Sequence, residues 1–148
     1  MKFKVRNRMF FATILLLIVV SIGCANNISR QYLTAARNFN DIYFKVIECI
    51  DISNKSKSIE LLQSKDFDQD FKKLEELMNV IRDTIPENKK IIYNNFRDRY
   101  DELTFLRSTS KDMLNMSIDD RRKISNIFVS IEMNKARWKD KSSSVVWE

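Results

Sequence analysis

The sequence predicts an all-α protein, an antiparallel (up-down) bundle of about four helices that follows an N-terminal signal or anchor segment. Two observations predict it. The 148 residues include one glycine and one proline, whereas turn-rich β architectures use both residues repeatedly. Apolar residues also recur at intervals of three and four along four stretches, which is the spacing of one face of a helix. We expect residues 1–24 to be the leader and residues 25–148 to form a single helical domain.

The leader has the three parts of a secretory signal in their usual order. Lys2, Lys4, Arg6 and Arg8 form a basic start, and the residues from Met9 to Cys24 carry no charge. An apolar core of 12 residues, 9–20, fits the roughly 7–15 that a signal peptide needs, and falls short of the roughly 20 that span a bilayer. The leader therefore predicts export of the remainder.

The end of the leader, Ser21-Ile22-Gly23-Cys24, resembles the lipobox of bacterial lipoproteins, with Ser21 standing where that family usually has Leu. The resemblance implies cleavage after Gly23 and lipidation of Cys24, which would then anchor the protein in a membrane. Ala25, in place of the Asp that often retains lipoproteins at the inner membrane, favours the outer membrane in a cell that has one. The protein would then lie at the periplasmic face or the cell surface.

Two other readings of the leader stay open. It can be a plain signal peptide cut after Gly23 or Ala25, or an uncleaved anchor whose basic end faces the cytoplasm. Cys49 lies among apolar residues of the first helix, so we expect a buried thiol. If Cys24 carries no lipid, a Cys24–Cys49 disulfide becomes possible.

The first helix is expected at residues 28–52. Its apolar residues form two interleaved heptad series, the pattern of a coiled-coil seam, made by Tyr32, Phe39 and Val46 and by Ala36, Tyr43 and Ile50. Ala35, Ile42 and Cys49 widen this seam to the width of a bundle helix.

The second helix is expected at residues 66–83, after a polar loop at residues 53–58. Asp66 and Gln69 have the spacing of a capping box. Its apolar stripe consists of Phe67, Phe71, Leu74, Met78 and Ile81.

The third helix is expected at residues 86–114. Thr84 and Glu87 predict another capping box, and Pro86 suits a first turn, where its missing N–H costs little. A single long helix kinked at Pro86 is the alternative. The stripe is formed by Ile92, Tyr93, Phe96, Tyr100, Leu103 and Leu106. Arg99 interrupts it, and we expect its stem on apolar surface and its head in water.

The fourth helix is expected at residues 118–141, with Ser117 as N-cap and Asp120 three positions on. Its stripe is formed by Ile124, Ile127, Phe128, Ile131 and Trp138, and it ends among several cations. A short tail, residues 142–148, follows and includes Trp147. We regard Lys135, Arg137, Trp138, Lys139 and Trp147 as candidates for contact with a partner or with lipid headgroups.

Charge and residue types exclude several functions. Four of the 26 basic residues precede Met9, which leaves 22 against 20 acidic ones in the exported part. The signs are mixed along the chain, unlike the basic stripe of a nucleic-acid binder. The sequence has no histidine, and its one glycine lies in the leader, so it lacks the commonest general base and any glycine-rich phosphate loop. We therefore expect no catalysis, no cofactor and no metal site.

Three functional hypotheses remain. The first is a lipid-anchored, non-enzymatic bundle that binds an unidentified envelope protein or has a structural role there. The second is a single-pass membrane protein whose first helix forms a coiled-coil oligomer through its seam. The third is a carrier with an apolar cavity lined by Phe39, Tyr43, Phe71, Phe96 and Phe128.

Overall fold

The computed structural model describes residues 30–110 and 112–139, and these residues form helices joined by loops, with no strand among them. The first helix comprises residues 30–48. It is followed by α2 (Lys55–Leu62), α3 (Asp68–Thr84), α4 (Lys90–Ser108) and α5 (Ile118–Lys139). Short 3-10 turns, η1 (Lys65–Phe67), η2 (Glu87–Lys89) and η3 (Met113–Asn115), precede the last three helices. The fold is an all-α bundle, as predicted.

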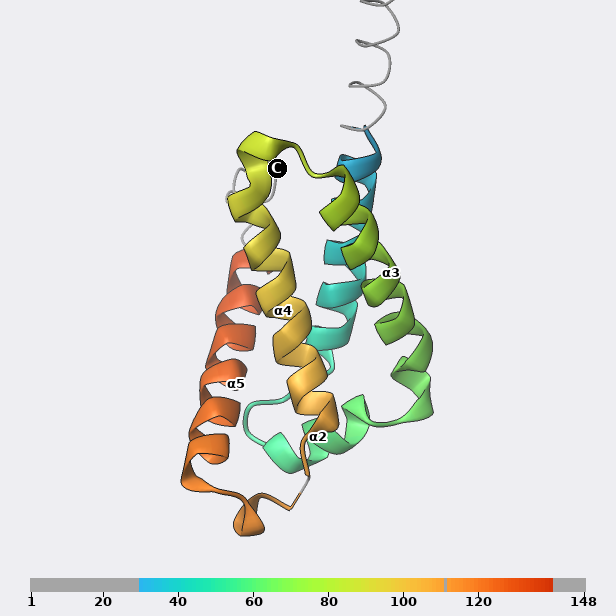
Figure 1. Cartoon of the computed structure of the whole chain (residues 1–148). Coiled ribbons are helices and arrows are strands. Elements are labelled where there is room, and N and C mark those ends of the chain that lie inside the picture. The colour runs from blue at the N-terminus through green and yellow to red at the C-terminus, as the bar shows by residue number, and fades with distance from the viewer. Residues whose placement is uncertain (1–29, 111, 140–148) are drawn as a thin grey trace, which may run out of the picture.

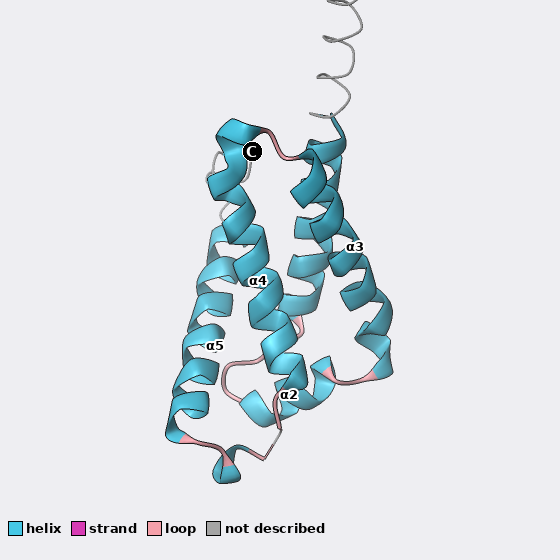
Figure 2. Cartoon of the chain, viewed as in Figure 1, coloured by secondary structure: helices cyan, strands magenta, loops and turns pink. Residues whose placement is uncertain are grey.

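The four long helices run alternately down and up, and the short α2 crosses the lower end of the bundle (Figures 1 and 2). The first helix and α4 descend in the view of Figure 1, while α3 and α5 ascend. Short connections between long helices favour this antiparallel arrangement, because each helix returns beside the one before it.

The core is made by the predicted stripes. All six residues of the first helix's two heptad series are at most 3% exposed. The stripe of α3 is buried from Phe67 to Ile81, and that of α5 from Ile124 to Ile131. The seam that predicted a coiled coil therefore packs inside this chain, and the structure gives no support to an oligomer formed through it.

The first helix ends four residues before its predicted end at residue 52, because a local hydrogen-bond network replaces the helical one. Ser58 Oγ accepts from the Asp51 N–H (2.8 Å) and donates to the Asp51 carbonyl (3.0 Å). Asp51 Oδ1 accepts from the Ser53 N–H and hydroxyl. Asn54 then caps α2 by accepting from the Lys57 N–H. The loop predicted at residues 53–58 is thus shorter, and α2 starts within it.

Two of the three predicted caps are wrong. At α3 the N-cap position is held by Phe67, whose side chain carries no hydrogen-bonding group. Thr84 Oγ1 donates to the Val80 carbonyl (2.6 Å) inside α3, and Pro86 precedes η2. The boundary near Pro86 is confirmed, so α3 and α4 are separate helices.

The predicted cap at Ser117 is confirmed. Its Oγ accepts from the Asp120 N–H (3.0 Å) and donates to the Asp120 carboxylate (2.7 Å). The helix predicted from 86 to 114 ends earlier, at Ser108. Gln63 Nε2 donates to the carbonyls of Arg107 (3.0 Å) and Thr109 (2.6 Å), so α2 supplies the donor that the last turn of α4 lacks.

We expect Ser117→Ala to lower the free energy of unfolding by about 1 kcal/mol, since an N-cap side chain is lost. Thr84→Ala is the matched control, because the Thr84 hydroxyl bonds back to its own helix; its effect should stay within about 0.5 kcal/mol. Urea denaturation followed by circular dichroism measures both. Equal losses from the two substitutions would contradict the assignment of the caps.

Candidate functional site

The side chains at the basic end of α5, predicted to contact a partner, point to different sides of the helix. Lys135 faces inward, with a side chain 14% exposed. Its Nζ donates to the carbonyl of Ile50, two residues past the end of the first helix, and to the Glu132 carboxylate (2.6 Å). A cation at a helix C-terminus also stabilises the negative end of the helix dipole. Lys135 therefore has a structural role, which sequence periodicity alone did not reveal.

The other residues predicted to contact a partner also lie in different surroundings. The Trp138 indole stacks on Phe44 of the first helix, with ring centroids 4.0 Å apart and planes 14° apart, yet remains 38% exposed. Arg137 lines a shallow hollow on α5 beside Asn134, and Lys139 is exposed. The described residues of the set do not make one continuous basic surface, and Trp147 lies outside the described residues.

A polar cluster that the sequence did not predict joins the first helix, α4 and α5 in the interior. Arg99, expected with its head in water, is instead 7% exposed. Its Nη1 donates to Asn40 Oδ1 (3.1 Å), and its guanidinium lies 5.4 Å from the centre of the Tyr43 ring. The Tyr43 hydroxyl accepts from Asn134 Nδ2 (3.0 Å). A buried charge is stable only when such partners surround it.

The sequence contains a signal for this cluster. Arg99 lies seven residues from Ile92 and from Leu106, and Asn134 lies seven from Ile127. A polar side chain at a heptad position among apolar ones indicates either an interrupted stripe or a buried polar contact. Only the packing of the helices decides between them.

Burial disfavours the charged forms of both titratable side chains in this cluster and shifts their pKa values accordingly. It raises the pKa of Tyr43 to about 12, against the opposing effects of the Arg99 charge and the Asn134 hydrogen bond. It lowers the pKa of Arg99 to about 10, against the nearby Tyr43 and Glu102. Tyr43 is thus neutral and Arg99 charged at pH 7, and neither exchanges protons there.

Glu102 is the acidic group near this cluster. Burial raises the pKa of its carboxyl above 4.5, while a hydrogen bond from Ser130 Oγ (3.1 Å) acts the other way. Ser130 and Glu102 connect α5 to α4.

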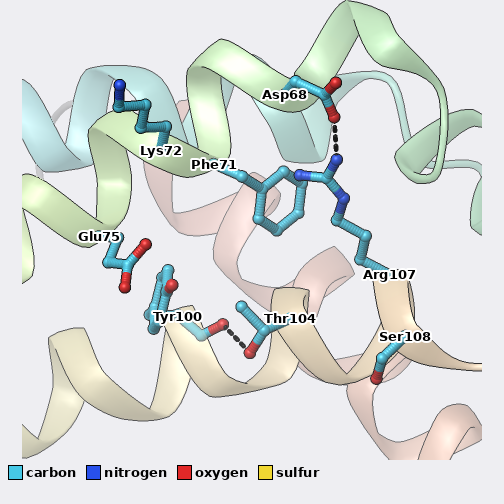
Figure 3. A pocket seen from close by; sticks show the side chains of 8 residues that line it. All are labelled: Asp68, Phe71, Lys72, Glu75, Tyr100, Thr104, Arg107 and Ser108. Atoms are coloured by element: carbon cyan, nitrogen blue, oxygen red, sulfur yellow. Dashed lines mark hydrogen bonds and ion pairs between the residues drawn. The ribbon is translucent and has the colours of Figure 1, made fainter.

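A hollow of about 550 Å³, open to solvent, lies between α3 and α4 (Figure 3). At one end the Arg107 guanidinium forms an ion pair with Asp68 and lies 4.4 Å from the centre of the Phe71 ring. At the other end Glu75 lies beside Tyr100. Burial raises the pKa of the Tyr100 hydroxyl, which weakens it as a proton donor.

The ion pair at one end of this hollow holds α3 to α4, and the side chains that line the hollow include no obvious reactive group. Asp68 forms an ion pair with Arg107 and so balances its charge. The ammonium of Lys72 points away from the Glu75 carboxylate (Figure 3). Asp68 and Asp70, in the first turn of α3, pair with neighbouring helices, Asp68 with Arg107 and Asp70 with Lys45 (2.7 Å). The acidic start of α3 thus connects it to both of its neighbours.

The aromatic residues proposed as a cavity lining contact one another instead. Phe39 stacks on Tyr43 with ring centroids 6.2 Å apart, and meets Phe96 edge-on at 5.2 Å. Phe128 is fully buried, and Phe71 borders the α3–α4 hollow. Such contacts are those of a packed core, so they do not favour the carrier hypothesis.

Cys49, expected to be buried, is an exposed free cysteine in the turn that follows the first helix. Its Sγ lies 3.6 Å from the Lys45 carbonyl oxygen. Ile50, the next residue, is 2% exposed, so the chain packs Ile50 in the core and leaves Cys49 at the surface.

The remaining site predictions cannot be placed, because Cys24 and Gly23 lie outside the described residues. Within residues 30–110 and 112–139, no group of three or more acidic or cysteine side chains is arranged to hold a metal ion. The same residues include no helix whose length and apolarity would let it cross a membrane.

Comparison with protein-family models, with curated proteins and with solved structures gives no match.

We expect Lys135→Met to lower the free energy of unfolding by about 1–3 kcal/mol, because the Ile50 carbonyl loses a charged donor. Lys139→Met, a loss of the same charge one turn further along α5, should change it by less than about 0.5 kcal/mol. Chemical denaturation at neutral pH measures both. An equal effect of the two substitutions would show that Lys135 acts only through its charge.

The raised pKa of the Glu102 carboxyl leads us to expect that stability depends on pH. Its pKa is raised in the folded state, so its contribution is fully present below 4.5 and is lost as the pH rises through the folded value. Glu102→Gln should therefore raise the free energy of unfolding at neutral pH. It should also reduce the loss of this free energy as the pH rises above 4.5. Asp101→Asn, at an exposed neighbouring carboxylate, controls for the lost negative charge. A stability profile unchanged by Glu102→Gln would contradict this assignment.

Proposed function

We propose that this protein is an exported, lipid-anchored helical bundle that serves as a non-enzymatic binding or structural component of a bacterial cell envelope. The observation that carries the proposal is the order of the leader: a basic start, an uncharged apolar core and the lipobox-like Ser21-Ile22-Gly23-Cys24. Cys24 precedes the first described residue of the bundle, Arg30, by only six positions. Acyl chains on Cys24 would therefore hold the bundle close to a membrane.

The properties of the bundle support a non-enzymatic role. The sequence has no histidine, and the buried Tyr43 and Arg99 have pKa values far from neutrality. The ion pairs of the α3–α4 hollow connect helices to one another. These features stabilise a rigid shape, which suits a protein that presents surfaces to a partner.

The uncleaved single-pass anchor is the second candidate, and the same apolar core of the leader favours it. In that case the bundle would also face outward, because the basic residues before Met9 stay on the cytoplasmic side. Oligomerisation through the first helix is less favoured, since its seam is already covered by α3, α4 and α5.

We expect Cys24→Ala to prevent lipidation and to move most of the protein out of the membrane fraction. The intact mass of the parent protein should correspond to a chain that begins at Cys24 and carries a lipid group, and membrane fractionation should show the change of location. Cys49→Ser, which removes the other cysteine at an exposed position, is the matched control and should change neither mass class nor location.

Retention of Cys24→Ala in the membrane, with Met1 still present in the intact mass, would overturn lipidation and favour the uncleaved anchor. Release of both parent and variant as unlipidated protein would favour plain secretion.

A further inference from the structure

One end of the bundle combines an exposed apolar side chain with several cations. We call it the tether-side end and define it by Arg30, Arg82, Lys89, Lys90 and Ile91. The first helix starts here, and α3 passes to α4 here, at the upper end of Figure 1. Lys89 Nζ lies 5.9 Å from the centre of the ring of Tyr32, which confirms that the two segments are neighbours.

Ile91 is the exposed apolar residue of this end. It lies in the first turn of α4 and is 82% exposed. It borders an open hollow lined also by Ile85 and Tyr93, with Arg82 and Lys90 at its edge. Large apolar side chains next to lysine and arginine are typical of surfaces that rest in the headgroup region of a membrane.

The opposite end of the bundle provides a comparison, because it also exposes apolar side chains. Leu114 is 88% and Ile118 67% exposed. Their charged neighbours are of both signs: Asp112 lies two residues before Leu114, whereas Asp119, Asp120, Arg121 and Arg122 follow Ile118. Anionic headgroups attract the cations beside Ile91, and the distance of each end from Cys24 decides between the two.

Some of the charge at the tether-side end is balanced locally. Arg82 pairs with Asp83 (2.9 Å), and Lys90 pairs with Glu87 (2.7 Å). All four side chains of these pairs are more than half exposed. Exposed pairs of this kind are weak and exchange easily for other partners, so the cations can turn to lipid phosphates.

The tether, the chain from Cys24 to Arg30, is short enough to select the tether-side end. Six peptide steps separate Cys24 from Arg30, and a fully extended chain gains at most about 3.3–3.6 Å per residue. Arg30 thus lies within about 20 Å of a lipid on Cys24. Of the two apolar ends, only the one with Ile91 adjoins the start of the first helix (Figure 1).

From these observations we propose that the tether-side end docks on the anionic membrane surface, with Ile91 among the headgroups and with Lys89, Lys90 and Arg82 facing lipid phosphates. The bundle then stands on the membrane and directs its opposite end, with Leu114 and Ile118, away from it. This inference rests on the proposed membrane anchor and adds the orientation of the bundle.

The test compares fluorescent probes at the two ends of the full-length, processed protein. One probe is attached to Ile91→Cys and the other to Leu114→Cys, each in a Cys49→Ser background so that the exposed native thiol takes no label. Both positions are more than four-fifths exposed, so neither substitution disturbs the core, and circular dichroism checks the fold. The protein is reconstituted in vesicles that contain phosphatidylglycerol.

A nitroxide-labelled lipid should quench the probe at position 91 several-fold more strongly than the probe at position 114, and aqueous iodide should show the reverse order. Equal iodide quenching of the two probes on protein that floats with the vesicles would overturn the docking and leave the anchor intact. Failure of the unlabelled parent to float with the vesicles would overturn the anchor and the docking together.

Discussion

The buried Arg99 guanidinium constrains how the first helix, α4 and α5 pack against one another. A charge this deeply buried is tolerated only with an acceptor and a polarisable surface around it, and here Asn40 and the Tyr43 ring supply them. Tyr43 in turn is held by Asn134. These contacts connect the first helix, α4 and α5, so sliding any one of the three by a turn would leave buried polar groups without partners. Apolar stripes alone define no such register.

The helical stripes were predictable because burial on a helix follows a fixed period. The heptad series of the first helix and the stripe of α3 are buried as their spacing requires. The ends of the helices were harder to predict. Asp51 and Ser58 stop the first helix through contacts that join two segments, and α2 holds the end of α4 through Gln63. Such tertiary contacts override the local capping patterns from which helix ends are predicted.

The candidate site was less predictable than the fold, for a geometric reason. Adjacent residues on a helix point about 100° apart, so a run of cations in sequence is not a basic surface in space. Lys135 turns inward to the Ile50 carbonyl, whereas Lys139 remains exposed. Ile91 illustrates the converse. It stood beside the predicted stripe residue Ile92, and only the structure shows that it lies outside the core.

The most exposed large apolar side chains of the described residues lie at the ends of the bundle, and this placement bears on function. Along the sides, charges connect helices to each other, as Asp70 does with Lys45 and Asp68 with Arg107. At the ends, Ile91, Leu114 and Ile118 remain exposed, and charges of both signs lie beside them. The two ends differ in their distance from Cys24, which precedes Arg30 by six residues. A lipid anchor on Cys24 would therefore orient the bundle, since it would hold the end with Ile91 near the membrane and leave the other end available to a partner.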